Sequence, residues 1–158
     1  MSARHVLRTL NRIARCIIED NTDELPIVLA GIDERGSNLS SILFNILDKE
    51  ISAPIHHCRF QNGAFQHPEK LNFDGTFLVI FDDVIFSGKT MFTAFHKALD
   101  IGEPDTIKLA ALIDRGHRKF PVEAQYIGKY SPTKLREHVQ CKFSSQHKPL
   151  GIDLVDAE

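Results

Sequence analysis

The strongest constraint on the fold is a run of five apolar residues, 77–81, that turns abruptly into Asp82-Asp83. Such a run is typical of a strand buried on both faces. The segment 87–90, Ser-Gly-Lys-Thr, then supplies turn residues, and apolar side chains recur at helical spacing from Met91 to Leu99. The pattern predicts a strand, a loop and a helix, the repeating unit of α/β proteins. In open α/β sheets ligands bind beyond the carboxyl ends of the strands, so this segment marks a candidate site.

The rest of the chain repeats this alternation. Helical spacing predicts a helix from Leu7 to Ile18 and another from Leu39 to Leu47, with a turn and N-cap at residues 36–38. Strands are expected at 25–32, 55–60 and 107–113, a long loop at 61–75, a helix C-cap at Gly102, and shorter strands at one sheet edge within 124–155. We therefore predict a single α/β domain over residues 1–158, with a central, mostly parallel sheet flanked by helices and a small hood from the C-terminal part.

Composition narrows the classes of protein to which this chain can belong. The 158 residues, 42% of them apolar, can bury one full core but not two large domains. A net charge of −2 gives no global basic field that would attract nucleic acid or a membrane. Three widely spaced cysteines indicate neither a disulfide framework nor a cysteine zinc site. No apolar run approaches the roughly 18 residues that span a bilayer, so we expect a cytoplasmic protein.

The residues from Asp82 to Thr90 have the chemistry of a ribose 5-phosphate site. Adjacent carboxylates can accept hydrogen bonds from the two hydroxyls of a ribose. A turn at Gly88 would point backbone N–H groups, together with the Ser87 and Thr90 hydroxyls, at a phosphate near a helix N-terminus. A nucleotide-triphosphate P-loop is a poorer match, because that motif needs a glycine at the position of Asp83. The remaining alternative is a strand that ends in two solvated acids before an ordinary helix start.

The segment 77–90 resembles the signature of the type I phosphoribosyltransferases: apolar residues, two acids and a loop of the form (T/S)-G-x-T. Segments 114–121 and 126–133 are similar to the pyrimidine operon attenuation regulator and uracil phosphoribosyltransferase family, and the resemblance covers residues 4–142. It implies a type I phosphoribosyltransferase fold and transfer of ribose 5-phosphate from phosphoribosyl diphosphate to a base. It also implies magnesium carried by the diphosphate, with no direct protein ligand. A sheet edge and a small hood suggest self-association, so we expect a homo-oligomer.

The resemblance also assigns roles to residues. The acids Asp82 and Asp83 would bind the ribose, and the catalytic set would be Asp82, Asp83, Arg35 and Arg59. The 5-phosphate would be held by Val84, Ile85, Phe86, Ser87, Gly88, Lys89 and Thr90. The diphosphate would be held by Asp33, Glu34, Arg35 and Gly36. The base would be bordered by Phe86, Arg115, Gly116, His117 and Arg118.

Phe86 bears on the choice of base. Purine-salvage members of the family usually have an acid at this position, which hydrogen-bonds the purine, whereas an aromatic side chain cannot make that bond. Phe86 therefore favours uracil, converted to UMP, over hypoxanthine or guanine. A purine phosphoribosyltransferase is one alternative, and a loop phenylalanine that only packs in the core is the structural one.

Two departures from the family pattern point to an alternative class of function. The diphosphate loop of the family has no acid pair like Asp33-Glu34, and Cys58-Arg59-Phe60-Gln61 stands where the family has Tyr-Arg-Asp-Asp. These changes support a catalytically weak or inactive nucleotide or phosphoribosyl diphosphate sensor, or an RNA-binding regulator. The arginines at 4, 8, 12 and 15 lie on one predicted helix face and would suit RNA. A solvated helix face is the favoured interpretation, because the net charge is negative.

Overall fold

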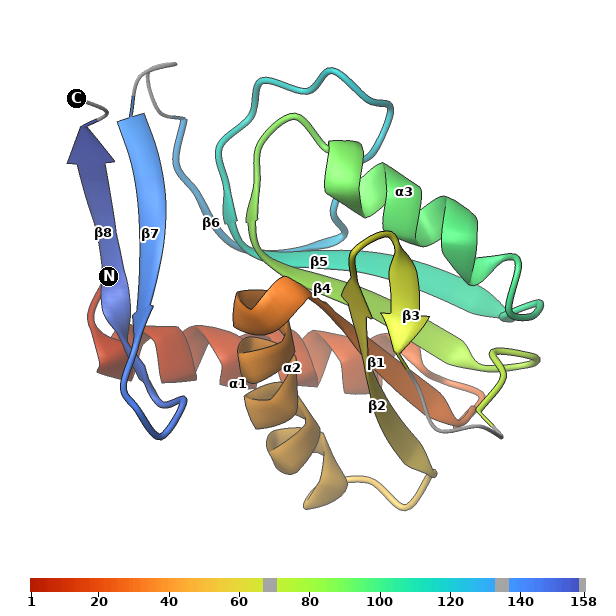
Figure 1. The fold of residues 1–158 in the computed structure, drawn as a ribbon. Coiled ribbons are helices and arrows are strands. Elements are labelled where there is room, and N and C mark those ends of the chain that lie inside the picture. Colours follow the sequence, from red (N-terminus) through yellow and green to blue (C-terminus); the bar gives the residue numbers. More distant parts are fainter. Residues whose placement is uncertain (67–70, 133–136, 157–158) are drawn as a thin grey trace.

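Parallel strands made from the apolar runs form the centre of the molecule (Figure 1). The computed structural model describes residues 1–66, 71–132 and 137–156. Its six-stranded sheet has the order β3-β2-β1-β4-β5-β6, and only β3 runs antiparallel to its neighbour. The bounds of these strands are β1 Ile27–Ile32, β2 Ile55–Gln61, β3 Ala64–Gln66, β4 Phe77–Ile85, β5 Thr106–Asp114 and β6 Tyr126–Tyr130.

Helices cover both faces of this sheet, which explains why its central strands are apolar throughout. Helices α1 (Ala3–Asp20) and α2 (Asp33–Asp48) lie on one face, and α3 (Lys89–Ala98) lies on the other (Figure 1). A hydrophobic core lies on each face of the sheet, and alternate residues of β1 contribute to the two cores. Leu29 packs in the core on the side of α1 and α2, and Ala30 in the core on the side of α3. The predicted fold class, a mostly parallel α/β sheet flanked by helices, is confirmed.

The C-terminal strands form a separate two-stranded sheet, which we call the hood. Strands β7 (Glu137–Phe143) and β8 (Pro149–Asp156) pair antiparallel, and residues 1–2 extend the hood along β8. The backbone N–H of Ile152 donates to the Met1 carbonyl at 2.8 Å. The prediction of strands at one sheet edge is therefore right for β6 and wrong for β7 and β8, which pair with each other and with the N-terminus instead.

Four local predictions need correction. Helix α2 begins directly after β1, so residues 36–38 lie inside its first turns; no turn or N-cap forms there. The two aspartates do not end their strand as predicted, because pairing of β4 with β5 continues past them to Ile85. Helix α3 is capped at Leu99, and Gly102 instead packs against Asp74. The expected loop 61–75 contains β3, and its residues 67–70 lie outside the described part of the chain.

Candidate active site

Asp82 and Asp83 sit at the carboxyl end of β4, one strand from the start of α2. The Asp83 backbone N–H donates to Oδ1 of Asp82 at 2.8 Å. Burial raises the pKa of Asp82 well above its ordinary value, and the neighbouring Asp83 charge, a hydrogen bond to that side chain and the charge of Asp33 raise it further. The acid pair is therefore an electrostatically costly arrangement, of the kind that marks functional sites.

Two other elements meet the acid pair. The first turn of α2 packs so closely on β4 that a Cβ at Gly36 would lie 2.8 Å from the Phe81 carbonyl oxygen. Hood strand β7 brings Cys141 against Asp83: burial, then the Asp83 charge and hydrogen bond, raise the pKa of this thiol, while the nearby Arg35 charge lowers it. The structure thus joins Arg35, Asp83 and Cys141 from three separate elements.

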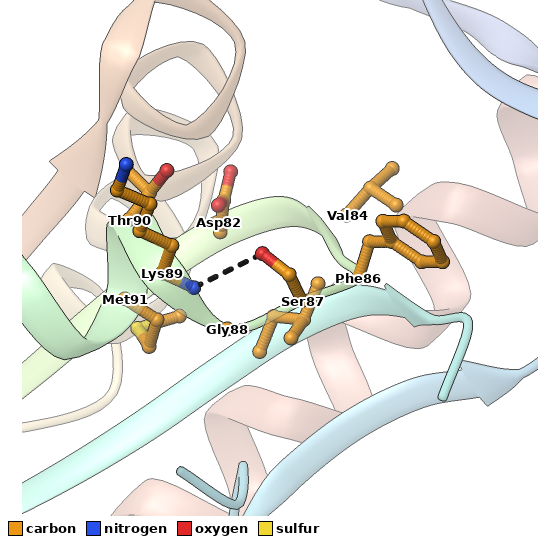
Figure 2. Close-up of a pocket in the computed structure, with 9 residues that line it drawn as sticks. Asp82, Val84, Phe86, Ser87, Gly88, Lys89, Thr90 and Met91 are labelled. Atoms are coloured by element: carbon orange, nitrogen blue, oxygen red, sulfur yellow. Dashed lines mark hydrogen bonds between the residues drawn. The ribbon is translucent and has the colours of Figure 1, made fainter. Parts of the chain in front are cut away.

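A pocket of about 130 Å³ opens where β4 leads into α3 (Figure 2). Gly88 occupies a left-handed backbone conformation with φ of 81°, and a Cβ there would lie 2.4 Å from Cγ2 of Val122. Only glycine therefore fits this turn without displacement. The Lys89 backbone N–H donates to the Ser87 hydroxyl at 3.3 Å. The pocket brings together one acid, all seven residues predicted to hold the phosphate, and Met91: Asp82, Val84, Ile85, Phe86, Ser87, Gly88, Lys89, Thr90 and Met91.

The loop after β5 sets the direction of the peptide groups in this pocket. Nη1 of Arg118 donates to the Phe86 carbonyl at 2.9 Å, and the Lys119 and Phe120 backbone N–H groups donate to the Ser87 carbonyl at 2.9 and 3.1 Å. In a trans peptide the next N–H points opposite to the carbonyl. The N–H groups of Ser87 and Gly88 are therefore turned away from the β5 loop. These hydrogen bonds could not be predicted from the sequence, since no local pattern links residues 86–87 with 118–120.

The residues predicted to border the base cluster around Phe86. The guanidinium carbon of Arg115 lies 4.4 Å from the centre of the Phe86 ring, and the His117 ring centre lies 5.6 Å from it. His117 is exposed and Gly116 has φ of 72°. The Arg118 side chain holds this loop in place, because it pairs with Asp114 at 2.7 Å and also donates to the Phe86 carbonyl. In Figure 2 the Phe86 ring lies at the far end of the pocket from Thr90.

Arg59 and Arg35 occupy different positions relative to the acids. Arg59 lies on β2 opposite Gly31, whose other neighbour in the sheet is Phe81, so one strand separates Arg59 from β4. Arg35 is exposed in the first turn of α2. Across the described residues, no group of three or more His, Cys, Asp and Glu side chains is placed to hold a metal ion. No helix in the described ranges is long and apolar enough to cross a membrane.

Comparison with known proteins identifies the family. A family model described as the phosphoribosyl transferase domain matches residues 2–141. The chain belongs to the phosphoribosyltransferases. Two curated relatives are named bifunctional protein PyrR: that of Streptomyces coelicolor is 35% identical, covering 89% of this chain and 80% of the relative, and that of Haemophilus ducreyi is 34% identical, covering 85% and 83%. The predicted kinship with the pyrimidine regulator family is confirmed.

Solved phosphoribosyltransferase structures share the fold. A hypoxanthine phosphoribosyltransferase of Trypanosoma cruzi superposes with a TM-score of 0.77 at 16% identity, covering all of this chain (100%) and 95% of that one. A hypoxanthine-guanine phosphoribosyltransferase of Bacillus anthracis gives a TM-score of 0.69 at 19% identity, covering 83% and 79%. At these identities the likeness shows the type I phosphoribosyltransferase fold and nothing about the base.

Proposed function

We propose that this phosphoribosyltransferase transfers ribose 5-phosphate from magnesium-bound phosphoribosyl diphosphate to uracil, giving UMP and diphosphate. One observation carries the proposal: the acid pair on β4 leads without interruption into a small pocket at the N-terminus of α3. The helix dipole and the Ser87 and Thr90 hydroxyls favour a phosphate there. Magnesium would enter as part of the substrate.

The chain's own residues would hold and polarise the substrate. Asp82 and Asp83 accept hydrogen bonds from the ribose hydroxyls, which fixes the sugar while positive charge develops at its anomeric carbon. Arg35 precedes Gly36, at which a Cβ would lie 3.4 Å from the Asp82 Cα, and it would stabilise the charge that accumulates on the leaving diphosphate. Arg59 supplies a second cation one strand further away. No covalent nucleophile is required.

The preference for a pyrimidine rests on the PyrR relatives and on Phe86. Its ring packs against Arg115 and His117, so this cluster, rather than a carboxylate, would border the base. A purine would lose the hydrogen bond that an acid provides at this position. RNA binding is less favoured: Arg12 donates to the Ile127 and Gly128 carbonyls, and Arg15 pairs with Glu50, so two arginines of the basic face have partners within the chain. The cytoplasmic location and homo-oligomer stay predictions.

Diphosphate release tests the proposal. Purified protein with magnesium and phosphoribosyl diphosphate is assayed with uracil, hypoxanthine, guanine, adenine and orotate, and calorimetry measures binding of phosphoribosyl diphosphate and UMP. Release with uracil alone supports the proposal, and release with a purine alone rejects the base. Tight binding without release for any base would make the chain a ligand sensor, in line with its Asp33-Glu34 pair.

Asp83→Asn supplies the matched binding test. Loss of a charge-assisted hydrogen bond costs about 1.5–3 kcal/mol, so binding of phosphoribosyl diphosphate should weaken by roughly 10- to 100-fold. Asp23→Asn is the control, since Asp23 is an exposed residue in the turn after α1. Unchanged binding in Asp83→Asn would remove the acid pair from the ribose site.

A further inference from the structure

Arg115 is a buried cation between two parts of the molecule that are distant in sequence. Only 5% of its surface is exposed, although it follows directly after β5. A buried guanidinium is stable only where its charge and its N–H groups are matched by partners. The residues around Arg115 must therefore supply partners for its charge and its N–H groups.

The contacts of Arg115 reach in two directions. On one side its guanidinium lies over the Phe86 ring at 4.4 Å, and its backbone N–H donates to the Ile85 carbonyl at 2.9 Å. Both of these residues line the phosphate pocket. On the other side Nη2 donates to the backbone carbonyl of Glu137, the first residue of hood strand β7. One side chain thus joins the phosphate loop to the hood.

The hood strand also reaches the acid pair. Cys141, four residues beyond Glu137 on β7, packs against Asp83. A shift of β7 at Glu137 would therefore change what covers Asp83. Since the phosphate loop and β7 share a single rigid guanidinium, ordering one of them reduces the freedom of the other.

We propose that Arg115 is a positioning residue that couples the phosphate loop to the hood, so that a phosphate held by residues 84–90 also holds β7 over the acid pair. The inference rests on the proposed phosphate site. The coupling is reciprocal, as any linkage between two equilibria must be. Lysine cannot replace arginine here, because a point charge cannot stack flat on a ring and donate sideways at once.

Hydrogen exchange with ribose 5-phosphate as the probe tests the coupling. In the wild-type protein the ligand should slow amide exchange in residues 84–90 and also in 137–143, the latter by about fivefold or more. Each variant is studied at a ribose 5-phosphate concentration that saturates it, so that a change in affinity does not enter the comparison. In Arg115→Lys the loop should then be protected while the ligand no longer slows exchange in β7. Phe86→Leu should give the same uncoupling, and Phe86→Tyr should restore it by keeping the ring. Arg15→Lys is the matched control, because Arg15 is an exposed cation of α1 whose ion pair is with Glu50, just after α2, and not with a hood residue.

The outcomes separate the two proposals. If β7 gains the same protection in wild type, Arg115→Lys and Phe86→Leu, or gains none in wild type while the loop is protected, Arg115 is not the link. If the wild-type loop itself shows no protection, the phosphate site fails and the coupling fails with it. Should Arg115→Lys not fold, as judged by its thermal transition, the comparison of Phe86→Leu with Phe86→Tyr decides the question.

Discussion

Asp82 loses hydration that an exposed carboxylate would keep, and Asp83 adds a second negative charge beside it. Its pKa is raised in the folded state, so the folded protein binds more protons than the unfolded chain between the ordinary value of 3.8 and the raised one. The free energy of unfolding should therefore fall as the pH rises through this window. In the proposed function, binding of the ribose would be the gain that offsets this loss of stability.

Asp82→Asn removes the buried charge. We expect this variant to unfold at higher denaturant concentration than wild type at pH 7, with a gain of about 1 kcal/mol or more, and to lose ribose 5-phosphate binding. The gain should shrink as the pH falls toward 4. Urea titrations across this pH range measure both quantities. A pH-independent difference between the two proteins would show that the Asp82 charge is not the cause.

Gly88 offers a second test at a single residue. Gly88→Ala must adopt a left-handed backbone and also push against Val122, so it should destabilise the protein by more than the ~1 kcal/mol of backbone strain and weaken ribose 5-phosphate binding. Gly63→Ala is the matched control: its φ is 76°, but a Cβ there has nothing within 4 Å. Calorimetry of both variants measures the difference. Equal losses of stability and binding would mean that the contact with Val122 is unimportant.

Among the elements, α2 determines where Arg35 lies. A Cβ at Gly31 of β1 would sit 2.3 Å from the Ser37 Cα, so the first turns of α2 rest directly on the strand. Ser40, fully buried, donates to the Ser37 carbonyl at 3.1 Å and lies 2.7 Å from Nε2 of His57 on β2. Through His57 this serine fastens the helix to β2.

Ser40→Ala should therefore weaken the attachment of α2. It leaves the half-buried His57 ring without this partner, at a cost of about 1–3 kcal/mol in the free energy of unfolding. Ser41→Ala changes an exposed serine of the same helix and should stay within roughly 0.5 kcal/mol of wild type. Denaturant titration compares the two variants, and similar losses in both would contradict a specific role for Ser40.

The spacing of apolar residues predicted those elements that a single continuous segment defines. Helix α1, strand β1 and the unit from β4 to β5 follow from apolar spacing alone. The start of α2 was missed because Asp33 takes a left-handed φ of 51° and the small residues after it resemble a turn. Asn62 and Gly63, between β2 and β3, have φ values of 53° and 76°. An Asn-Gly pair favours such a tight turn, so the sequence does contain a local signal for this hairpin.

The candidate site divides in the same way. The pocket lined by Asp82 and residues 84–90 could be predicted as one unit because these residues form one continuous segment. The contributions of Glu137 and Cys141 could not, since a strand pattern reveals neither its partner nor what it covers. Contacts between residues distant in the chain depend on tertiary packing that no local spacing encodes.

For the whole molecule, the hood depends on both ends of the chain. A Cβ at Gly151 would lie 2.8 Å from the Met1 carbonyl, so Gly151→Ala should push residues 1–2 off β8 and speed amide exchange in the hood by about tenfold, as a loss of ~1.4 kcal/mol in local stability predicts. The main thermal transition should change little. Ser2→Ala is the control, because it removes the side chain that caps α1 but keeps the backbone bridge. Equal hood exchange in both variants would contradict this role of the N-terminus.

The pairing of residues 1–2 with β8 also orders events during synthesis. β4, α3 and β5, which form the pocket at the N-terminus of α3, precede β8 in the chain and so leave the ribosome before it. Residues 1–2 must wait for β8 before the hood can close over Asp83. A ribosome-bound chain that has not yet released β8 would therefore have this pocket beside an uncovered acid pair, and the proposed ligand could enter before the hood forms.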